Sequence, residues 1–239
     1  MKTKKMFKWI FLFICLSFTS CDEYRPDLDS KHCVNVNIKG VLHVEPTGEK
    51  INDILVEVFF KEKRKDFIYL GKILKVISGN TDENGVFNFN VVIDTMSFND
   101  YDLNVKVPRS NSKYISSVSG GNDEYVNISF RCFDIQALQN IDFAFYNKAI
   151  LTINLNRTET DNCSGLNVAH SFDGYQYTSN SFTTDSIQNG TSRILQLETA
   201  ADMDSRIRWI KFMMNGDRYH YADTLICRQN EDNIFNIYY

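Results

Sequence analysis

The chain has few of the residues that mark fibrous, repetitive or disordered proteins. Its 239 residues include only 3 prolines and 11 glycines, and neither a Gly-X-Y period nor an apolar heptad repeat runs through it. Hydrophobic residues make up 43% of the chain and charged residues 23%, so there is enough apolar material for a large core. The composition therefore predicts one large or two small globular domains.

The motifs of common catalytic sites are also missing. There is no Gly-x-Ser-x-Gly nucleophile elbow and no glycine-rich loop of the kind that cradles phosphate. A zinc site needs several converging nitrogen or sulfur ligands, but the histidines are scattered, at His32, His43, His170 and His220. Residues 82–85 and 202–204 carry oxygen ligands without the spacing of a complete calcium loop. We therefore expect no enzyme, no metal site and no cofactor.

The first twenty residues have the composition of an export signal. A basic stretch, with lysines at 2, 4, 5 and 8, precedes the apolar residues 9–16, which are too few to span a bilayer, since that needs about 20. They lead into Leu16-Ser17-Phe18-Thr19-Ser20-Cys21, which resembles the lipobox of bacterial lipoproteins. This resemblance implies cleavage before Cys21, acylation of that residue by chains such as palmitate, and anchoring to a membrane. An ordinary secretory signal with an incidental cysteine is the alternative.

Residues 21–32 are polar and lack periodicity, so they predict a flexible tether. Acidic residues directly after Cys21 resemble the surface-export signal of Bacteroidota-type lipoproteins, which implies a lipid anchor in the outer membrane and a place on the cell surface. The periplasmic face stays open, and under the enterobacterial rule Asp22 would instead imply retention in the inner membrane.

The charge of the mature chain argues against nucleic acid as a partner. Removal of residues 1–20 removes four of the 26 basic residues and none of the 30 acidic ones, which leaves 22 against 30, a formal charge of −8. Phosphate backbones repel such a surface.

Alternation of apolar and polar residues begins at Cys33 and predicts strands. The clearest segments are 34–38, 54–60, 87–93, 101–107 and 126–132, with looser ones at 67–77 and 114–118. About seven strands in this length are typical of a sandwich of two sheets. A second series covers 141–145, 149–155, 195–197, 210–214, 225–228 and 234–239, whereas 171–190 is expected to be a long loop with short strands. The predicted fold is all-β, with two antiparallel β-sandwich domains in tandem, at 33–133 and 134–239.

Residues 39–107 contain a recognisable hairpin pattern, Thr81-Asp82-Glu83-Asn84-Gly85-Val86-Phe87. Asp82 and Asn84 are suited to bond the local backbone and Gly85 tolerates positive φ, so the chain can reverse tightly there. Together with 39–42 and 54–58, this pattern resembles the carboxypeptidase regulatory-like, or transthyretin-like, sandwich. The chain departs from that family at 99–101, where a Gly-Tyr pair is usual. The resemblance implies a sandwich with an accessory, non-hydrolytic role.

Four cysteines remain after Cys21: Cys33, Cys132, Cys163 and Cys227. An even number outside the cytoplasm suggests two disulfides, one in each predicted domain. A bond between Cys33 and Cys132 would tie the first strand to the last and add about 2–4 kcal/mol. However, the alternation places Cys33 on the face of Asn35 and Cys132 on the core face, so unpaired thiols are the alternative.

Three short segments resemble the Asp-Ser/Thr-aliphatic acceptor of Bacteroidota-type O-glycosylation: 94–96, 185–187 and 223–225. That resemblance implies glycans on Thr95, Ser186 and Thr224, which would keep these turns at the surface.

Aromatic residues crowd one polar segment, and Phe172, Tyr175 and Tyr177 are candidates for stacking on the rings of a glycan. The alternative is that these rings cover the second sandwich. Trp209 is expected to pack in a core.

These patterns favour a membrane-anchored, non-catalytic lipoprotein that acts as a binding or assembly module at the cell envelope, with a glycan or a partner protein as ligand. Lipoproteins of the kind it resembles often accompany outer-membrane uptake systems. The alternative is a small fimbrillin-like, pilus-associated structural subunit, in which strand 234–239 passes between subunits. An enzyme built on the second domain ranks last, because no acid–base pair stands out.

Overall fold

The computed structural model of the chain describes residues 22–28, 30–63, 71–116, 124–157, 163–172, 178–183 and 192–239, except the side chains of 178–183 and 192. Strands dominate these ranges, which confirms the all-β class. No helix within them is long and apolar enough to cross a membrane. The predicted export signal and Cys21 lie outside the described residues.

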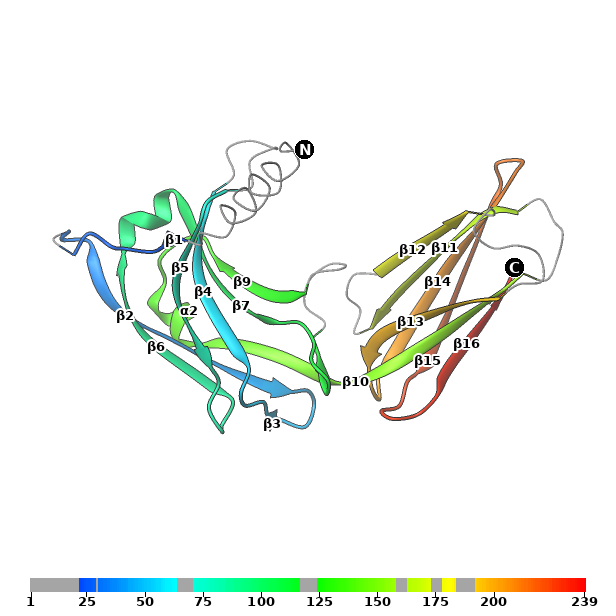
Figure 1. Ribbon diagram of the computed structural model, residues 1–239, viewed down its shortest axis with the longest axis horizontal. Coiled ribbons are helices and arrows are strands. Elements are labelled where there is room, and N and C mark those ends of the chain that lie inside the picture. The colour runs from blue at the N-terminus through cyan, green and yellow to red at the C-terminus, as the bar shows by residue number, and fades with distance from the viewer. Residues whose placement is uncertain are drawn as a thin grey trace, which may run out of the picture.

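The first lobe is a sandwich of two sheets, at the left of Figure 1. One sheet has the strand order β1-β5-β4-β7-β9. The other is built on β2, which pairs with β6, with β3 and with the start of β10. The bounds of these elements are β1 Asp22–Glu23, β2 Cys33–Val44, β3 Glu49–Lys50, β4 Leu55–Glu62, β5 Ile73–Asn80, β6 Val86–Asp94, β7 Tyr101–Pro108, β9 Tyr125–Phe130 and β10 Ile141–Asn156.

Phe60 lies at the centre of the first core. Its ring is 4.7 Å from that of Tyr24, 5.5 Å from that of Phe98 and 6.2 Å from that of Tyr101, measured between centroids. The predicted alternation is confirmed here, since Val56 and Val58 on β4 and Leu103 and Val105 on β7 are fully buried.

The segment predicted as a flexible tether begins with docked residues. β1 pairs in parallel with β5, and the Tyr24 hydroxyl lies 3.1 Å from the Ser97 hydroxyl and accepts the Asp94 N–H at 2.9 Å. The Tyr24 side chain thus has an apolar contact for its ring and hydrogen-bond partners for its hydroxyl, so it is fixed against the first lobe. The composition of the segment alone does not reveal this docking.

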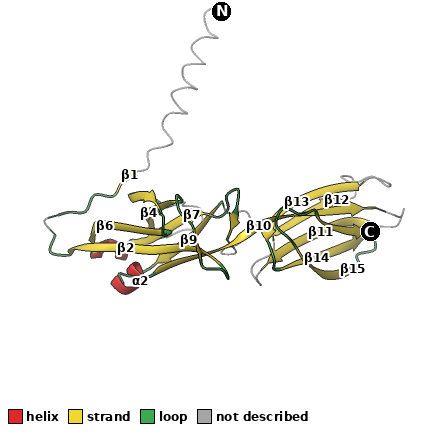
Figure 2. Cartoon of the chain, turned by 90° about the horizontal axis from the view of Figure 1, so that it is seen from below, coloured by secondary structure: helices red, strands yellow, loops and turns green. Residues whose placement is uncertain are grey.

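Two short helices close the end of the first lobe within the described ranges, η1 (Thr95–Asn99) and α2 (Ile135–Gln139) (Figure 2). Each begins after an aspartate whose carboxylate accepts backbone N–H groups: Asp94 from Met96 at 2.9 Å, and Asp134 from Gln136 at 2.9 Å and Ala137 at 3.1 Å. Aspartate is a preferred residue at this position, so Asp134 was a local signal for the start of α2.

The tight turn predicted at residues 81–85 is confirmed, but the predicted hairpin is not, because β5 and β6, which the turn joins, belong to different sheets. The Asp82 carboxylate accepts the N–H groups of Asn84 at 2.9 Å and Val86 at 2.8 Å, and Gly85 has φ +68°. A Cβ at Gly85 would lie 2.5 Å from the Leu42 carbonyl oxygen, so glycine is needed there for space as well as for its backbone angle.

The second lobe packs a sheet of order β12-β11-β14-β15 on the strands β13, β10 and β16 (Figure 1). Its core contains Leu151, Ile153, Leu166, Val168 and Ile207. Trp209 packs against this core, as predicted. The bounds are β11 Cys163–Phe172, β12 Thr178–Thr183, β13 Ser192–Ala200, β14 Asp204–Met213, β15 Arg218–Ile226 and β16 Asn233–Tyr238.

One strand, β10, belongs to both lobes. Residues 141–145 pair with β2, residues 148–156 pair with β13, and residues 151–156 also pair with β16. Between them, Tyr146 and Asn147 pair with β8 (Tyr114–Ile115). The sequence predicted two separate strands here. The division into 33–133 and 134–239 remains a prediction, and the first residues of β10 complete the first sheet.

The segment 171–190, predicted as a long loop with short strands, contains the end of β11 and all of β12. One feature differs from the predictions: the sheets are mixed rather than antiparallel throughout, since β1–β5, β2–β10 and β10–β16 are parallel pairs.

Candidate functional site

Of the predicted glycan-stacking residues, Phe172 is unavailable to a ligand. Its side chain is only 5% exposed, and its ring lies edge-on to Tyr146 at 6.1 Å and 6.2 Å from the His170 ring. The assignment of Phe172 to glycan binding was therefore wrong, because the ring serves as core. Tyr175 and Tyr177 lie outside the described residues.

Phe172 forms a small junction cluster where the lobes meet. Ile115 of β8, Phe172 of β11 and Ala200 of β13 are buried together, with Tyr146 and Met203 packed beside them. The cluster joins side chains from both lobes to the middle of β10.

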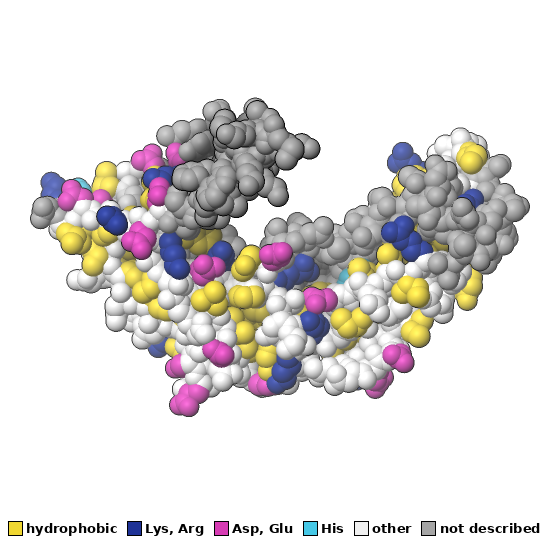
Figure 3. Space-filling view, in the orientation of Figure 1, with side chains coloured by type: hydrophobic (Ala, Val, Ile, Leu, Met, Phe, Trp, Pro, Cys, Tyr) yellow, Lys and Arg dark blue, Asp and Glu magenta, His cyan; other side chains and the backbone are white. Residues whose placement is uncertain are grey.

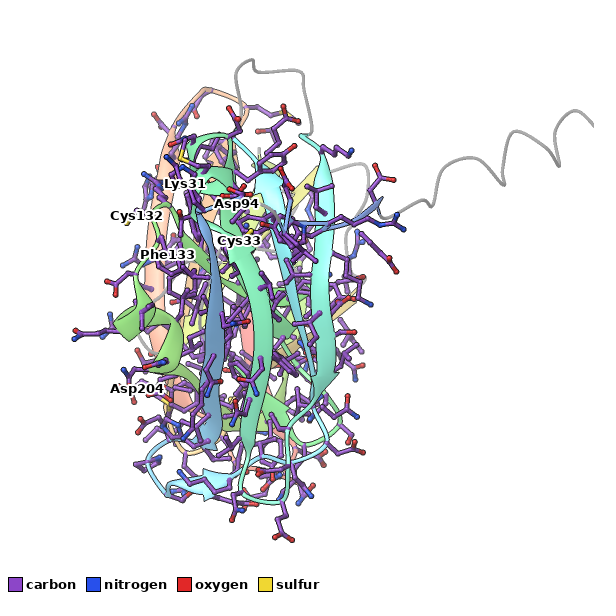
Figure 4. The ribbon with its side chains drawn as sticks, turned by 90° about the vertical axis from the view of Figure 1, so that its left-hand side faces the viewer. Lys31, Cys33, Asp94, Cys132, Phe133 and Asp204 are labelled. Carbon is purple, nitrogen blue, oxygen red and sulfur yellow. The ribbon has the colours of Figure 1, made fainter. Side chains whose placement is uncertain are left out.

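Cys33 and Cys132 lie at the same end of the first lobe (Figure 4). Both are unpaired thiols in the structure. The Cys33 thiol donates to the Asp27 carbonyl oxygen at 3.0 Å, and desolvation together with the nearby Asp94 and Asp27 raises its pKa. Cys132 follows β9 rather than lying in it, and is exposed. The bond between these two cysteines stays a prediction.

Cys163 and Cys227 cannot bond to each other in this fold. Cys163 lies opposite Met213 at one end of β14, whereas Cys227 follows β15 next to the end of β14 at Asp204. Nine residues of strand span roughly 30 Å, while a disulfide needs Cα atoms within about 7 Å. Both thiols are buried and unpaired. The prediction of one disulfide per domain was therefore wrong for the second domain. An even number of cysteines does not show which of them are close enough to pair.

The predicted O-glycosylation residues differ in accessibility. Thr224 is exposed on β15, whereas Thr95 is half-buried and its hydroxyl donates to the His32 carbonyl at 3.3 Å. Ser186 lies outside the described residues. All three modifications stay predictions.

A buried polar chain crosses the interior of the second lobe. The His170 ring nitrogen Nε2 lies 3.1 Å from the Thr199 hydroxyl, which lies 2.6 Å from the Ser205 hydroxyl. All three side chains are buried. A substrate would have to enter the core to reach these three side chains, so they do not fit a nucleophile–base arrangement. Its role is to satisfy polar groups inside the sandwich.

Burial, aided by the charge of Arg109, lowers the pKa of His170 from about 6.5 to about 4. The unfolded chain therefore gains a proton at this residue as the pH falls from 6.5 toward 4, while the folded chain stays neutral. We expect the free energy of unfolding to fall by up to about 3 kcal/mol over that interval. Urea denaturation at several pH values should show this loss in the wild type and not in His170→Gln. His220→Gln, at an exposed histidine of the same lobe, should retain it, and equal slopes in all three proteins would contradict the assignment.

The outer face of β11, β14 and β15 carries a row of polar side chains around a hollow of about 470 Å³. Its lining residues are Asn167, Ala169, Arg208, Trp209, Ile210, His220, Tyr221 and Ala222, of which Trp209 and Tyr221 have the strand phase of the core rather than of the outer face. This outer face was not predicted, because 210–214 was assigned to a strand from its apolar residues alone. The core positions of β14 are instead Ser205 and Ile207, and Met214 is 68% exposed. The alternating arginines at 206 and 208 were the available signal for an outward face.

The described residues contain no group of three or more histidine, cysteine, aspartate or glutamate side chains placed to hold a metal ion. On the face seen in Figure 3, acidic and basic side chains are mixed over both lobes.

No family model and no curated protein matches the sequence. Among solved structures, a mutant of the shaft pilin SpaA from Lactobacillus rhamnosus GG aligns over 86% of this chain and 98% of its own, with 9% identity and a TM-score of 0.34. The minor pilin GBS52 from Streptococcus agalactiae aligns over 85% and 94%, with 9% identity and a TM-score of 0.31. A candidate adhesin from Bacteroides ovatus aligns over 92% and 97%, with 9% identity and a TM-score of 0.28.

These are distant similarities between β-sandwich proteins, and with TM-scores and identities this low nothing about the function of this chain is drawn from them. The resemblance of residues 39–107 to the carboxypeptidase regulatory-like sandwich finds no match in the family models and stays a prediction.

Proposed function

We propose that this chain is a lipid-anchored, non-catalytic structural or adhesive subunit of the cell surface, in which both sandwiches act as one stiff unit. The observation that carries the proposal is β10, whose 16 residues are hydrogen-bonded into both lobes. At the usual rise such a strand is about 50 Å long. A strand cannot hinge between two ladders without breaking hydrogen bonds, so β10 couples the orientation of the lobes.

Further contacts brace the middle of β10. The N–H of Lys148 donates to the Lys113 carbonyl at 2.8 Å, and that of Ala201 donates to the Asn147 carbonyl at 2.7 Å. The Ser116 hydroxyl donates to the Ala144 carbonyl at 3.0 Å. Together with the junction cluster, these bonds support a joint that resists bending.

The docked N-terminal residues support a particular orientation on the membrane. Because β1 begins at Asp22, an acylated Cys21 would attach directly to the first lobe. The second lobe would then lie farther from the bilayer, as expected of a spacer or an adhesive tip.

Assembly by strand addition is a second candidate function, and the edge of the second lobe favours it. Within the second lobe, the three strands β13, β10 and β16 face the four strands β12, β11, β14 and β15. Tyr219 and Tyr221 of β15 remain 48% and 45% exposed although their strand phase is that of the core residue Ile207. A strand added beside β16 would cover them and use its unpaired backbone groups.

Cells expressing the wild type and Cys21→Ala test the anchor and the surface role. We expect mass spectrometry to find an acylated Cys21 as the mature N-terminus, and protease added to intact cells to remove the wild type. Cys21→Ala should leave the membrane fraction. A mature N-terminus elsewhere would refute the anchor, and SDS-resistant ladders would favour strand addition over a single spacer.

Small-angle X-ray scattering of the purified chain tests the stiff joint. The wild type should fit one shape, whereas four Gly/Ser residues inserted between Tyr146 and Asn147 should broaden the range of dimensions. Wild-type scattering that requires many lobe orientations would contradict the proposal.

A further inference from the structure

The hollow on the outer face of the second lobe is built from three strands in register. Arg208 lies between Ala169 and Ala222 on neighbouring strands, and Ile210 lies between Asn167 and His220. We call this surface, with the adjoining Arg206 and Thr224, the arginine groove. β14 and β15, which form two of its three strands, lie side by side in Figure 2.

Small side chains create the groove. Alanine on both sides of Arg208 leaves the space that longer residues on a sheet surface would fill. The resulting volume of about 470 Å³ is within the range of small-molecule sites. A second hollow of about 290 Å³ continues it and shares Arg208 and Ala222, with Arg206, Ile207, Asp223 and Thr224 completing its border, so that two arginines and one acidic residue line it.

The chemistry of the groove suits an anion that also carries hydroxyl groups. Arg206 and Arg208 are exposed and two residues apart on one face of a strand, roughly 7 Å. Guanidinium groups bind carboxylate or sulfate through paired hydrogen bonds. Asn167 and His220 add hydrogen-bonding groups at one end, and Ile210 with the alanines supplies an apolar floor.

We propose that the arginine groove binds an anionic saccharide. Its carboxylate or sulfate would lie on Arg206 and Arg208, its hydroxyls near Asn167 and His220, and the apolar face of a sugar ring on Ile210. This site goes beyond the proposed structural role and does not depend on it.

The net charge of the chain favours a short anionic saccharide over nucleic acid as the ligand of this groove. The whole chain has 30 acidic against 26 basic residues, so a long polyanion would meet repulsion outside the groove. Base stacking also needs an open aromatic face, whereas Trp209 and Tyr221, the aromatic residues bordering the hollow, have the strand phase of the core and stack on each other with ring centroids 5.3 Å apart.

Titration calorimetry on the full chain, purified from membranes in detergent, tests the site. The probes are an oligogalacturonate tetramer, a heparin-derived tetrasaccharide and cellotetraose, which carry carboxylate, mainly sulfate and no charge. We expect one or both anionic probes to bind, more weakly as salt rises, and the neutral probe not to bind. The anionic probe that binds more tightly shows whether the groove prefers carboxylate or sulfate.

Variants localise the binding. Arg208→Gln should weaken it about tenfold or more, and Ala222→Leu should do so by filling the hollow without changing charge. Arg228→Gln, at an exposed arginine of the same lobe outside the groove, is the matched control. Circular dichroism establishes that each variant is folded. Absence of binding by either anion, equal binding of cellotetraose, or equal weakening by Arg228→Gln would overturn the proposal.

Discussion

Replacement of Gly40 by alanine should destabilise the first lobe by several kcal/mol. A Cβ at this position would lie 2.4 Å from the Phe87 ring and 2.5 Å from the Ile141 carbonyl oxygen. The ring could shift, but the carbonyl belongs to β10 and is held by the parallel pairing of Gly40 with Ile141. Overpacking of a core usually costs about 1–3 kcal/mol, and we expect Gly40→Ala to reach or exceed that range because one of the clashing groups is backbone.

Urea denaturation of the purified chain measures this effect. Lys39→Ala, at an exposed neighbour on the same strand, controls for changes in strand propensity and should shift the free energy of unfolding by no more than about 0.5 kcal/mol. If Gly40→Ala does not accumulate as folded protein, Gly40→Ala with Phe87→Leu relieves the ring clash alone and should recover only part of the loss. A stability of Gly40→Ala equal to that of the control would disprove the close approach of β2 and β10.

Phe172→Ala should cost about 3–5 kcal/mol, as large truncations of buried rings do. The side chain is 5% exposed and lies in the junction cluster with Ile115 and Ala200, so its loss leaves a cavity where both lobes meet β10. We therefore expect the wild type to melt in one transition in calorimetry, and Phe172→Ala to melt at a lower temperature in two transitions, since the lobes lose their common packing.

Tyr238→Ala is the matched control, because it removes an aromatic ring that is 65% exposed on β16. Its melting temperature should stay close to that of the wild type. If Phe172→Ala melts like Tyr238→Ala, the ring is not part of a core, and the earlier interpretation of Phe172 as a residue open to a glycan would return.

The strands of the first lobe were predictable because one face of each meets a core. Val56, Val58 and Phe60 alternate with partly exposed residues, and this period of two is visible in any single strand. The tight turn at Asp82–Gly85 was predictable for a similar reason, since its hydrogen bonds and its positive φ are local, but its role as a connection between two different sheets was not. The helix after Asp134 was missed although its capping residue was present, because five residues are too few to show a helical period.

The candidate sites were less predictable because they depend on neighbours that are distant in sequence. The arginine groove combines Asn167, Arg208 and His220 from three strands, and their register is set by pairing along the whole sheet. Likewise, the residues next to Phe172 in the sequence do not indicate whether its side chain faces a ligand or a core.

The sequence by itself determined the all-β class, the tight turn at 82–85 and the positions of most strands, and it predicts an exported, acylated chain, because these properties depend on local side-chain periodicity, turn chemistry and one terminal motif. Only the tertiary structure decided that β10 runs through both lobes, that Cys163 and Cys227 lie at opposite ends of a strand, and that Phe172 is buried. Those features depend on which strands pair and in what register, and pairing is set by the packing of the whole core rather than by any one segment.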